Sequence, residues 1–237
     1  RIRSEAVGCW GFASSVDYSK LAWTKKPIIM KKMKKNFAFA LVSLFLMSCG
    51  PTIYLAPSGK QIAASHRTVA IMPPSVSIAA SKKMSADAMK EAQKTESVNF
   101  QQEIYAFMLK RKGQGKFFID IQDVETTNAL IAKATQNGEI LTTSDFCELL
   151  KVDGLITSNF AMSKPMSTGA AAALYLVAGG IGATNTVTTT LSIKDCQSSS
   201  LIWKYDYKYS GGLGSSAASL VEGLMRNASN KMPYRLN

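Results

Sequence analysis

Few residues in this chain of 237 are suited to chemistry, since it holds one histidine, His66, and four cysteines. A Ser-His-Asp triad needs a free histidine and a zinc site most often uses several, so one histidine excludes most such architectures. His66 stands just before a predicted strand and between two polar residues, which favours a solvated surface position. A metal site made of His66, Cys147 and Cys196 would draw its ligands from three unrelated elements. We therefore predict no catalytic residue, no metal and no cofactor.

The cysteines leave a disulfide open. Cys147 lies inside a predicted helix and Cys196 at the tip of a predicted hairpin. An oxidising compartment permits a bond between them, but nothing in the sequence places them together, so two unpaired thiols are favoured. As an alternative, Cys147 or a serine could serve as the nucleophile of an envelope hydrolase. That alternative is disfavoured because no base lies in a recognisable motif.

A three-part signal precedes Cys49. From Met30 the chain reads MKKMKKN, followed by the apolar run 37–47 and then Ser48-Cys49-Gly50. A cationic start, a short apolar stretch and a small residue at a cleavage site are the layout of a secretory signal peptide. The apolar stretch is too short to cross a bilayer, which takes about 20 residues.

The end of this signal resembles the lipobox of bacterial lipoproteins, whose signal peptidase cuts before a cysteine that carries diacylglycerol. The matching residues are Leu46, Met47, Ser48 and Cys49, and Met47 is a tolerated departure from the commonest choice. The resemblance implies lipid attachment at Cys49 and makes membrane lipid a partner. Gly50 is not the aspartate that retains lipoproteins at the inner membrane, which implies the periplasmic face of the outer membrane.

These signals divide the chain into four parts. Residues 1–29 precede the candidate start codons Met30 and Met33 and are interpreted as a non-native upstream extension. Residues 30–48 form the signal peptide, and 49–66, rich in Pro, Ser and Gly, are expected to be a lipid-anchored tether. Residues 67–237 are expected to form a single domain.

The net charge of +12 suggests nucleic-acid binding only until its distribution is considered. Nine of the 28 Lys and Arg residues, and two of the 16 acidic ones, lie in residues 1–48. The remaining chain carries a net charge of only +5, so we expect no nucleic-acid partner. Hydrophobic residues make up 46% of the chain and the mean hydropathy is +0.02, which excludes a disordered protein and a multi-span membrane protein.

Hydrophobic periodicity predicts a mixed α/β fold with the order β, α, β, α, α, β, β, β, α. The predicted strands are 68–72, 117–121, 155–162, 186–194 and 201–209. The predicted helices are 85–111, 126–134, 143–152 and 215–231. In the first helix Val98, Ile104, Tyr105, Met108 and Leu109 are expected to face the core, with Gln101, Gln102, Glu103 and Lys110 on the other face. The expected fold is a single mixed sheet of about five strands with helices packed on it. It ends in an antiparallel meander followed by an amphipathic helix.

Three local patterns are interpreted as structural. The Trp203, Tyr205, Tyr207 and Tyr209 stripe could stack bases or sugars but is expected to be core beneath the last helix. The glycine-rich segment 211–214 lacks the Lys and Ser/Thr of a phosphate loop and is interpreted as a flexible turn. The triplet 110–112 followed by Gly113 is interpreted as a helix C-terminus.

The uncharged segment Gly169–Ala183 is not explained by the predicted fold, because a short turn would connect its flanking strands. It is either a buried crossover or hairpin extension, or an exposed apolar segment that contacts the bilayer or a neighbouring subunit. The residues expected at such a contact are Ala173, Leu174, Tyr175, Leu176, Val177 and Ile181.

Together the lipobox, TVAIMPP, ELLKVDGLITSNF and the LSIKDCQSSSLIWKYDYKYSG hairpin resemble the CsgG / LpoB / TolB-N-like superfamily of periplasmic lipoproteins. The resemblance covers residues 66–234 and implies an α/β domain that binds protein partners or self-associates without catalysis. We expect a non-catalytic binding or assembly module of the cell envelope, with an unidentified protein partner. The alternative is a ring-forming, homo-oligomeric secretion or export accessory that uses Gly169–Ala183 as its contact.

Overall fold

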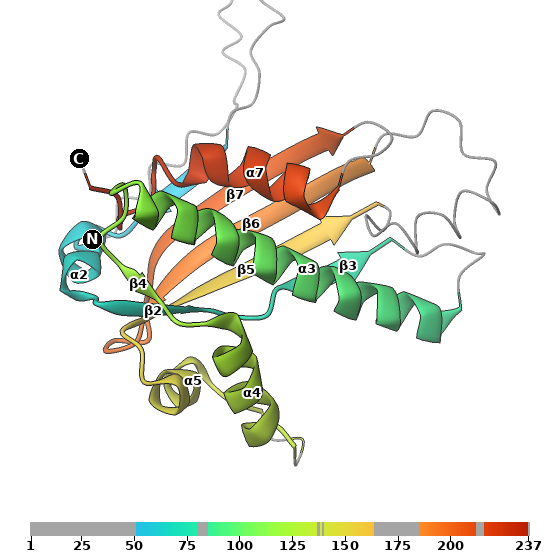
Figure 1. The fold of residues 1–237 in the computed structure, drawn as a ribbon, viewed down its shortest axis with the longest axis horizontal. Helices are drawn as coiled ribbons and strands as arrows, with labels where there is room; N and C mark the ends of the chain where they lie inside the picture. The colour runs from blue at the N-terminus through green and yellow to red at the C-terminus, as the bar shows by residue number, and fades with distance from the viewer. Residues whose placement is uncertain are drawn as a thin grey trace, which may run out of the picture. The chain divides into compact units, whose positions relative to one another are not determined.

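The computed structural model describes residues 51–79, 85–136, 138, 140–163, 185–211 and 216–236. Its elements lie around one open sheet (Figure 1). In chain order they are β1 (Thr52–Leu55), α2 (Gly59–Ser65), β2 (Thr68–Ile71), β3 (Ser75–Ile78), α3 (Ala86–Gly113), β4 (Asp120–Ile121), α4 (Val124–Ala134), α5 (Thr143–Leu150), β5 (Gly154–Met162), β6 (Asn185–Asp195), β7 (Leu201–Gly211) and α7 (Ala217–Ala228).

Within the described residues the sheet has seven strands, in the order β1-β7-β6-β5-β2-β4 with β3 paired to β5. β2 runs parallel to β4 and to β5, whereas β5, β6, β7 and β1 pair antiparallel in succession. This confirms the predicted mixed α/β sheet and its antiparallel meander followed by a helix. Two of the strands, β1 and β3, were not predicted: β1 lies in the segment interpreted as a tether, and β3 follows Pro73-Pro74.

Two prolines divide what would otherwise be one strand into β2 and β3. Ile71 pairs with Ile156 and Ser75 pairs with Asn159, so three residues between these pairs, 72–74, oppose two on β5. The extra residue is a bulge, at Pro73-Pro74, where the missing N–H groups cannot extend the ladder. The predicted strand 68–72 is therefore confirmed, and the chain resumes its pairing after the prolines.

The main core lies between one face of the sheet and the helices α3 and α7, which cross that face side by side in Figure 1. Phe100 of α3 stacks on Phe160 of β5 with ring centroids 4.0 Å apart. The buried side chains of α7 are Leu220, Val221, Leu224, Met225 and Ala228. Burial of these apolar side chains supplies the main driving force for folding.

The predicted face of α3 is wrong in part. Val98 and Leu109 are each 41% exposed, whereas Gln101, assigned to the polar face, is fully buried. Its Nε2 donates to the Ile71 carbonyl oxygen at 2.8 Å, and its amide exchanges hydrogen bonds with Asn128 of α4. Partners on other elements therefore satisfy a polar side chain that the helical pattern alone placed in solvent.

A second, smaller core forms on the opposite face, where α4 and α5 pack near β2 and the start of β5. Its buried members are Ala70, Met72, Cys147, Leu150, Val152 and Leu155. Thr142 and Asp145 form a capping box at the start of α5. Farther along this face, residues of β6 and β7 such as Thr188 and Lys208 are exposed.

The segment 49–66, expected to be a tether, instead contributes to the domain from Thr52 onward. β1 pairs with β7 from Thr52↔Asp206 to Leu55↔Trp203, and α2 buries Ala63 in the main core. Of the proline and glycine residues that suggested a tether, Pro57 lies in the turn between β1 and α2, and Gly59 is the first residue of α2. The ordered domain therefore begins about fifteen residues earlier than the predicted boundary at residue 67.

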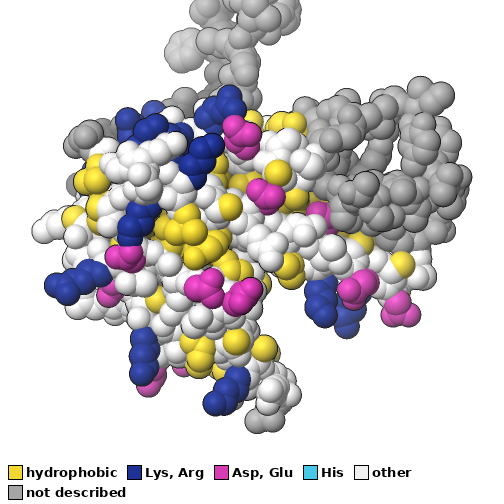
Figure 2. Space-filling model, viewed as in Figure 1, with side chains coloured by type: hydrophobic (Ala, Val, Ile, Leu, Met, Phe, Trp, Pro, Cys, Tyr) yellow, Lys and Arg dark blue, Asp and Glu magenta, His cyan; other side chains and the backbone are white. Residues whose placement is uncertain are grey.

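The predicted helix C-terminus at 110–112 is confirmed, because all three cations lie in the last turn of α3. Figure 2 shows Lys and Arg side chains gathered where Figure 1, in the same view, places the C-terminal ends of α3 and α7. The predicted strand 117–121 is shorter than expected: only Asp120–Ile121 form β4, and Phe117 makes an isolated bridge to Arg235. Among the helices in the described part of the chain, none is long and apolar enough to span a bilayer.

Candidate functional site: a pocket beside the Cys147–Cys196 disulfide

A hollow of about 460 Å³ opens where α2, α5 and the turn after β6 meet. The pairing of Gly154 with Asp195 places the start of β5 beside the end of β6. The residues that precede β5 and those that follow β6 therefore lie together. Its lining residues are Ser65, His66, Cys147, Val152, Asp153, Asp195, Cys196 and Gln197.

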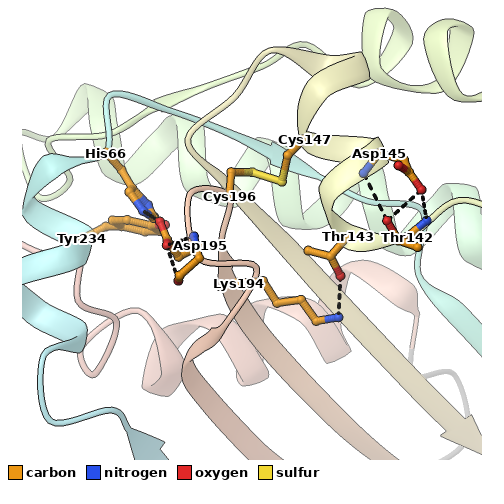
Figure 3. Close-up of a disulfide and its surroundings, with 10 residues drawn as sticks. His66, Thr142, Thr143, Asp145, Cys147, Lys194, Asp195, Cys196 and Tyr234 are labelled. Carbon is orange, nitrogen blue, oxygen red and sulfur yellow. Dashed lines mark hydrogen bonds and ion pairs between the residues drawn. A yellow bond between two sulfur atoms is a disulfide. The ribbon is translucent and has the colours of Figure 1, made fainter.

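Cys147 and Cys196 are joined by a disulfide with an S–S distance of 2.05 Å and a Cα–Cα distance of 5.5 Å. The bond links α5 to the β6–β7 turn (Figure 3) and overturns the preference for two free thiols. The sequence did hold a usable signal for it. Cys147 precedes the first strand of the predicted meander and Cys196 follows the second, and these two strand ends are adjacent in any antiparallel pair.

His66 is buried, with 5% of its surface exposed, which contradicts the expected solvated position. Its Nε2 lies 2.9 Å from Oδ1 of Asp195 and its Nδ1 lies 2.8 Å from the Tyr234 hydroxyl (Figure 3). A carboxylate only accepts hydrogen bonds, so Nε2 carries the proton and donates it to Asp195. Nδ1 then accepts from the Tyr234 hydroxyl. Sequence reasoning missed this arrangement because Asp195 and Tyr234 lie 129 and 168 residues away.

Gly154 makes room for the imidazole. A Cβ built on this residue would lie 2.9 Å from Nδ1 and Cε1 of His66 and 3.0 Å from the Tyr234 hydroxyl oxygen. The two 2.9 Å separations are shorter than real Cβ atoms show, and the 3.0 Å separation would require the Tyr234 side chain to shift. The first residue of β5 is therefore a glycine because the ring of His66 lies directly against its Cα.

The carboxylate of Asp195 is fully engaged. Its Oδ2 accepts from the backbone N–H of Ser198 at 2.7 Å and from the Ser198 hydroxyl. Burial would raise the pKa of Asp195, but the hydrogen bonds from Ser198 and His66 outweigh burial and hold the pKa below its ordinary value. Burial also raises the pKa of Tyr234, and the nearby charges of Asp195 and Asp153 add to the increase. Asp195 is therefore charged and Tyr234 neutral at physiological pH.

Asp153 closes the other side of the hollow. Its Oδ2 accepts the backbone N–H groups of Arg67 and Thr68 at 2.7 and 2.8 Å. Burial opposes ionisation, but the hydrogen bonds from Thr68 and Arg67, together with the positive charge of Arg67, outweigh it and lower the pKa of Asp153 overall. The residue thereby ties the chain between α5 and β5 to the start of β2, where the sequence analysis expected only the end of a helix.

This arrangement is suited to stabilising the fold rather than to bond cleavage. Both ring nitrogens of His66 are occupied by protein partners, so a reaction that uses it as a base would first break one of these hydrogen bonds. Cys147 cannot act as a nucleophile while it is part of a disulfide. Among the residues that the structure describes, no group of three or more His, Cys, Asp or Glu side chains could hold a metal.

The remaining predicted site residues have mixed outcomes. The aromatic stripe is core as expected, since Trp203 and Tyr205 are fully buried while Tyr207 and Tyr209 are partly buried against the same cluster. The lipobox with Cys49, the segment Gly169–Ala183 with its expected contact residues, and residues 212–214 of the glycine-rich turn lie outside the described residues.

Comparisons with known proteins leave the family open. No family model and no curated protein matches the chain. Solved structures that resemble it include lipoprotein GNA1162 from Neisseria meningitidis, with 12% identity and a TM-score of 0.38, covering 69% of this chain and 94% of that one. A PelC dodecamer from Paraburkholderia phytofirmans has 12% identity and a TM-score of 0.34, covering 79% and 98%. The LpoB C-terminal domain from Salmonella enterica has 12% identity and a TM-score of 0.30, covering 72% and 93%. At TM-scores this low we draw nothing about function from these structures.

Proposed function

We propose that this chain is a lipoprotein anchored through Cys49 at the periplasmic face of the outer membrane, where its domain binds an envelope protein without catalysis. The observation that carries the proposal is the position of the candidate lipobox. It ends at Cys49, and the first strand of the domain begins at Thr52. Signal, cleavage point and start of the fold thus follow one another along the chain, as a secreted and lipidated domain requires.

The chemistry of the pocket supports the non-catalytic part of the proposal. Its histidine, carboxylates and cysteines are held by one another or by backbone groups, which stabilises the fold. A disulfide suits an oxidising compartment such as the periplasm. Anchoring would confine the domain near one surface and raise its effective concentration toward partners held there, so that weak contacts suffice.

The anchor is tested by labelling cells with a palmitate analogue and determining the mass of the purified protein. The wild-type chain should begin at Cys49 and carry the mass of diacylglycerol, and Cys49→Ala should take up no label. The matched control is the double variant Cys147→Ser/Cys196→Ser, which loses two cysteines but should keep the label. Label on Cys49→Ala, or an unmodified Cys49 with upstream residues attached, contradicts the proposal.

The binding role is tested by placing a photo-crosslinking amino acid at single exposed positions in cells. Gln197 samples the pocket, Thr188 the uncovered sheet face and Glu91 the outer side of α3. A binding module should give one discrete heteromeric adduct from one of these faces, and Cys49→Ala should lower its yield. Equal adducts at all three positions, or none, would contradict a specific partner. An adduct with twice the mass of the chain would favour the homo-oligomeric alternative.

A further inference from the structure

We infer that β1 is the membrane-facing edge of the domain and that its exposed apolar side chains rest in the lipid headgroup region. This inference rests on the proposed anchor at Cys49 and adds to it a surface and an orientation. The residues concerned are Ile53, Tyr54 and Leu55, which are 40%, 39% and 38% exposed.

The chain between the proposed lipid anchor and the first strand is short. Only Gly50 and Pro51 separate Cys49 from Thr52, the first residue of β1. Three fully extended residues span at most about 11 Å, so the start of β1 lies within about 11 Å of the Cα of Cys49, whose sulfur would carry the lipid. The headgroup layer of one leaflet is itself about 5–7 Å thick. A strand that begins this close to the acylated cysteine starts beside the headgroup layer.

The edge of the sheet formed by β1 is uncharged and exposed. Among the strands that the structure describes, β1 lies at one end of the order and pairs with β7 alone, so it is an edge strand of this sheet. From Cys49 to Gly59 the chain contains no charged residue. Edge strands that face water are normally protected by charged side chains, and an uncharged apolar edge invites a covering surface. All four residues of β1 are exposed.

The side chains of Ile53, Tyr54 and Leu55 are of types that suit the headgroup region. Ile53 and Leu55 point to one side of the sheet and Tyr54 to the other, because successive side chains alternate along a strand. Isoleucine and leucine gain free energy on leaving water, and tyrosine is enriched at headgroup depth because its ring is apolar and its hydroxyl polar. The outward backbone groups of an edge strand can bond to water or headgroups there, whereas the hydrocarbon core would leave them unpaired.

A cation lies beside this edge. The register pairs Thr52 with Asp206, and Lys208 continues β7 two residues beyond that pair, past the start of β1. Lys208 is exposed. A lysine close to a surface of anionic lipid is attracted to it, and the attraction falls off within a Debye length. Its position thus favours anionic headgroups next to the anchor.

The test uses the full mature lipoprotein, reconstituted into vesicles of phosphatidylethanolamine and phosphatidylglycerol whose acyl chains carry bromine as a fluorescence quencher. Trp203 is the one tryptophan after Cys49 and is fully buried, so it gives a constant background. Tyr54→Trp adds a probe on β1. The matched control is Ile140→Trp, at a residue 93% exposed between α4 and α5, which pack near β2 at the other end of the strand order.

We expect brominated lipid to quench the added fluorescence of Tyr54→Trp and to leave that of Ile140→Trp unchanged. Adding Ile53→Asp and Leu55→Asp to Tyr54→Trp should reduce the quenching, while thermal unfolding followed by circular dichroism shows that the domain still folds. Vesicle-bound protein with equal quenching at both positions, or with none at 54, overturns the inference. If unquenched protein also sediments as a dimer, a second copy covers the edge instead. If no variant floats with the vesicles, the anchor itself is refuted, and the inference with it.

Discussion

Two regions of the domain differ in whether their side chains find partners within the domain. In the corner around the Cys147–Cys196 disulfide, polar side chains are paired with partners from distant parts of the chain, as in the His66–Asp195–Tyr234 group. Along β1, at the far edge of the sheet from β2 and β4, three apolar side chains remain exposed. The first region is complete within the described residues, whereas the second leaves apolar surface for something outside the domain to cover. This difference separates residues that stabilise the fold from residues available for contact.

The largest effect should come from removing the disulfide. The bond closes a loop between residues 49 positions apart. Opening it in Cys147→Ser/Cys196→Ser should lower the free energy of unfolding by about 4 kcal/mol, because the unfolded chain regains conformational entropy. Urea unfolding with and without dithiothreitol measures this. Reductant should bring the wild-type protein close to the variant and leave the variant unaffected. A difference below about 1 kcal/mol would mean that the noncovalent contacts of the corner suffice.

A methyl group at Gly154 should be the next most damaging change. Gly154→Ala would push against the imidazole of His66 and the Tyr234 hydroxyl and disturb the bond to Asp195. We expect a loss of about 1–3 kcal/mol in the free energy of unfolding, typical of overpacking.

The matched control for this change is Gly223→Ala in the middle of α7, where the nearest outside atom would lie 4.0 Å from the new Cβ. That substitution should raise stability by about 0.5–1 kcal/mol, because alanine favours the helix. If both variants lose stability equally, the close approach of His66 is not the reason for a glycine at position 154.

Acidification should weaken the paired corner through Asp195. Its pKa is lower in the folded than in the unfolded chain, so the unfolded chain takes up the proton first as the pH falls. The stabilisation is complete above the unfolded value of about 4 and is lost as the pH falls through the lower folded value. Asp195→Asn should therefore be less stable at neutral pH and lose less stability on acidification. Urea midpoints between neutral pH and about pH 3 measure this.

Two comparisons sharpen the pH experiment. Asp153→Asn should also flatten the acid dependence, because the pKa of Asp153 is likewise lowered in the fold. The exposed Glu91→Gln on α3 tests a carboxyl group outside the corner and should change the dependence less. An acid dependence in Asp195→Asn identical to that of the wild type would show that this carboxylate does not couple the corner to pH.

The smallest effect should come from the exposed edge. Ile53→Thr with Leu55→Thr removes apolar side chains from β1 but keeps residues that favour strands. In solution the free energy of unfolding should change by no more than about 0.5 kcal/mol, as for other surface substitutions. The measurement is the same urea titration on detergent-solubilised protein. A loss above about 1 kcal/mol would show that β1 stabilises the domain as the corner does, and would remove the contrast between the two regions.

Much of the fold followed from short-range patterns. The alternation of 186–194 and 201–209 predicted the hairpin of β6 and β7, and the periodicity of 85–111 predicted α3. The buried aromatic stripe was predicted for the same reason, since strand residues two apart share a face. Pro57 and Gly59 gave the wrong result for residues 49–66, because turn residues mark a bend without showing whether strands flank it.

The sequence by itself determined the order of most helices and strands and the candidate anchor at Cys49, because those signals lie in neighbouring residues. Only the tertiary structure decided the surroundings of His66, the pairing of Cys147 with Cys196, the burial of Gln101 and the exposure of β1. Each of these depends on which distant segments the sheet brings together, and the pairing of β5 with β6 and of β1 with β7 fixes them. A side chain's partners across such pairings are not encoded in its own neighbourhood, so periodicity could not reveal them.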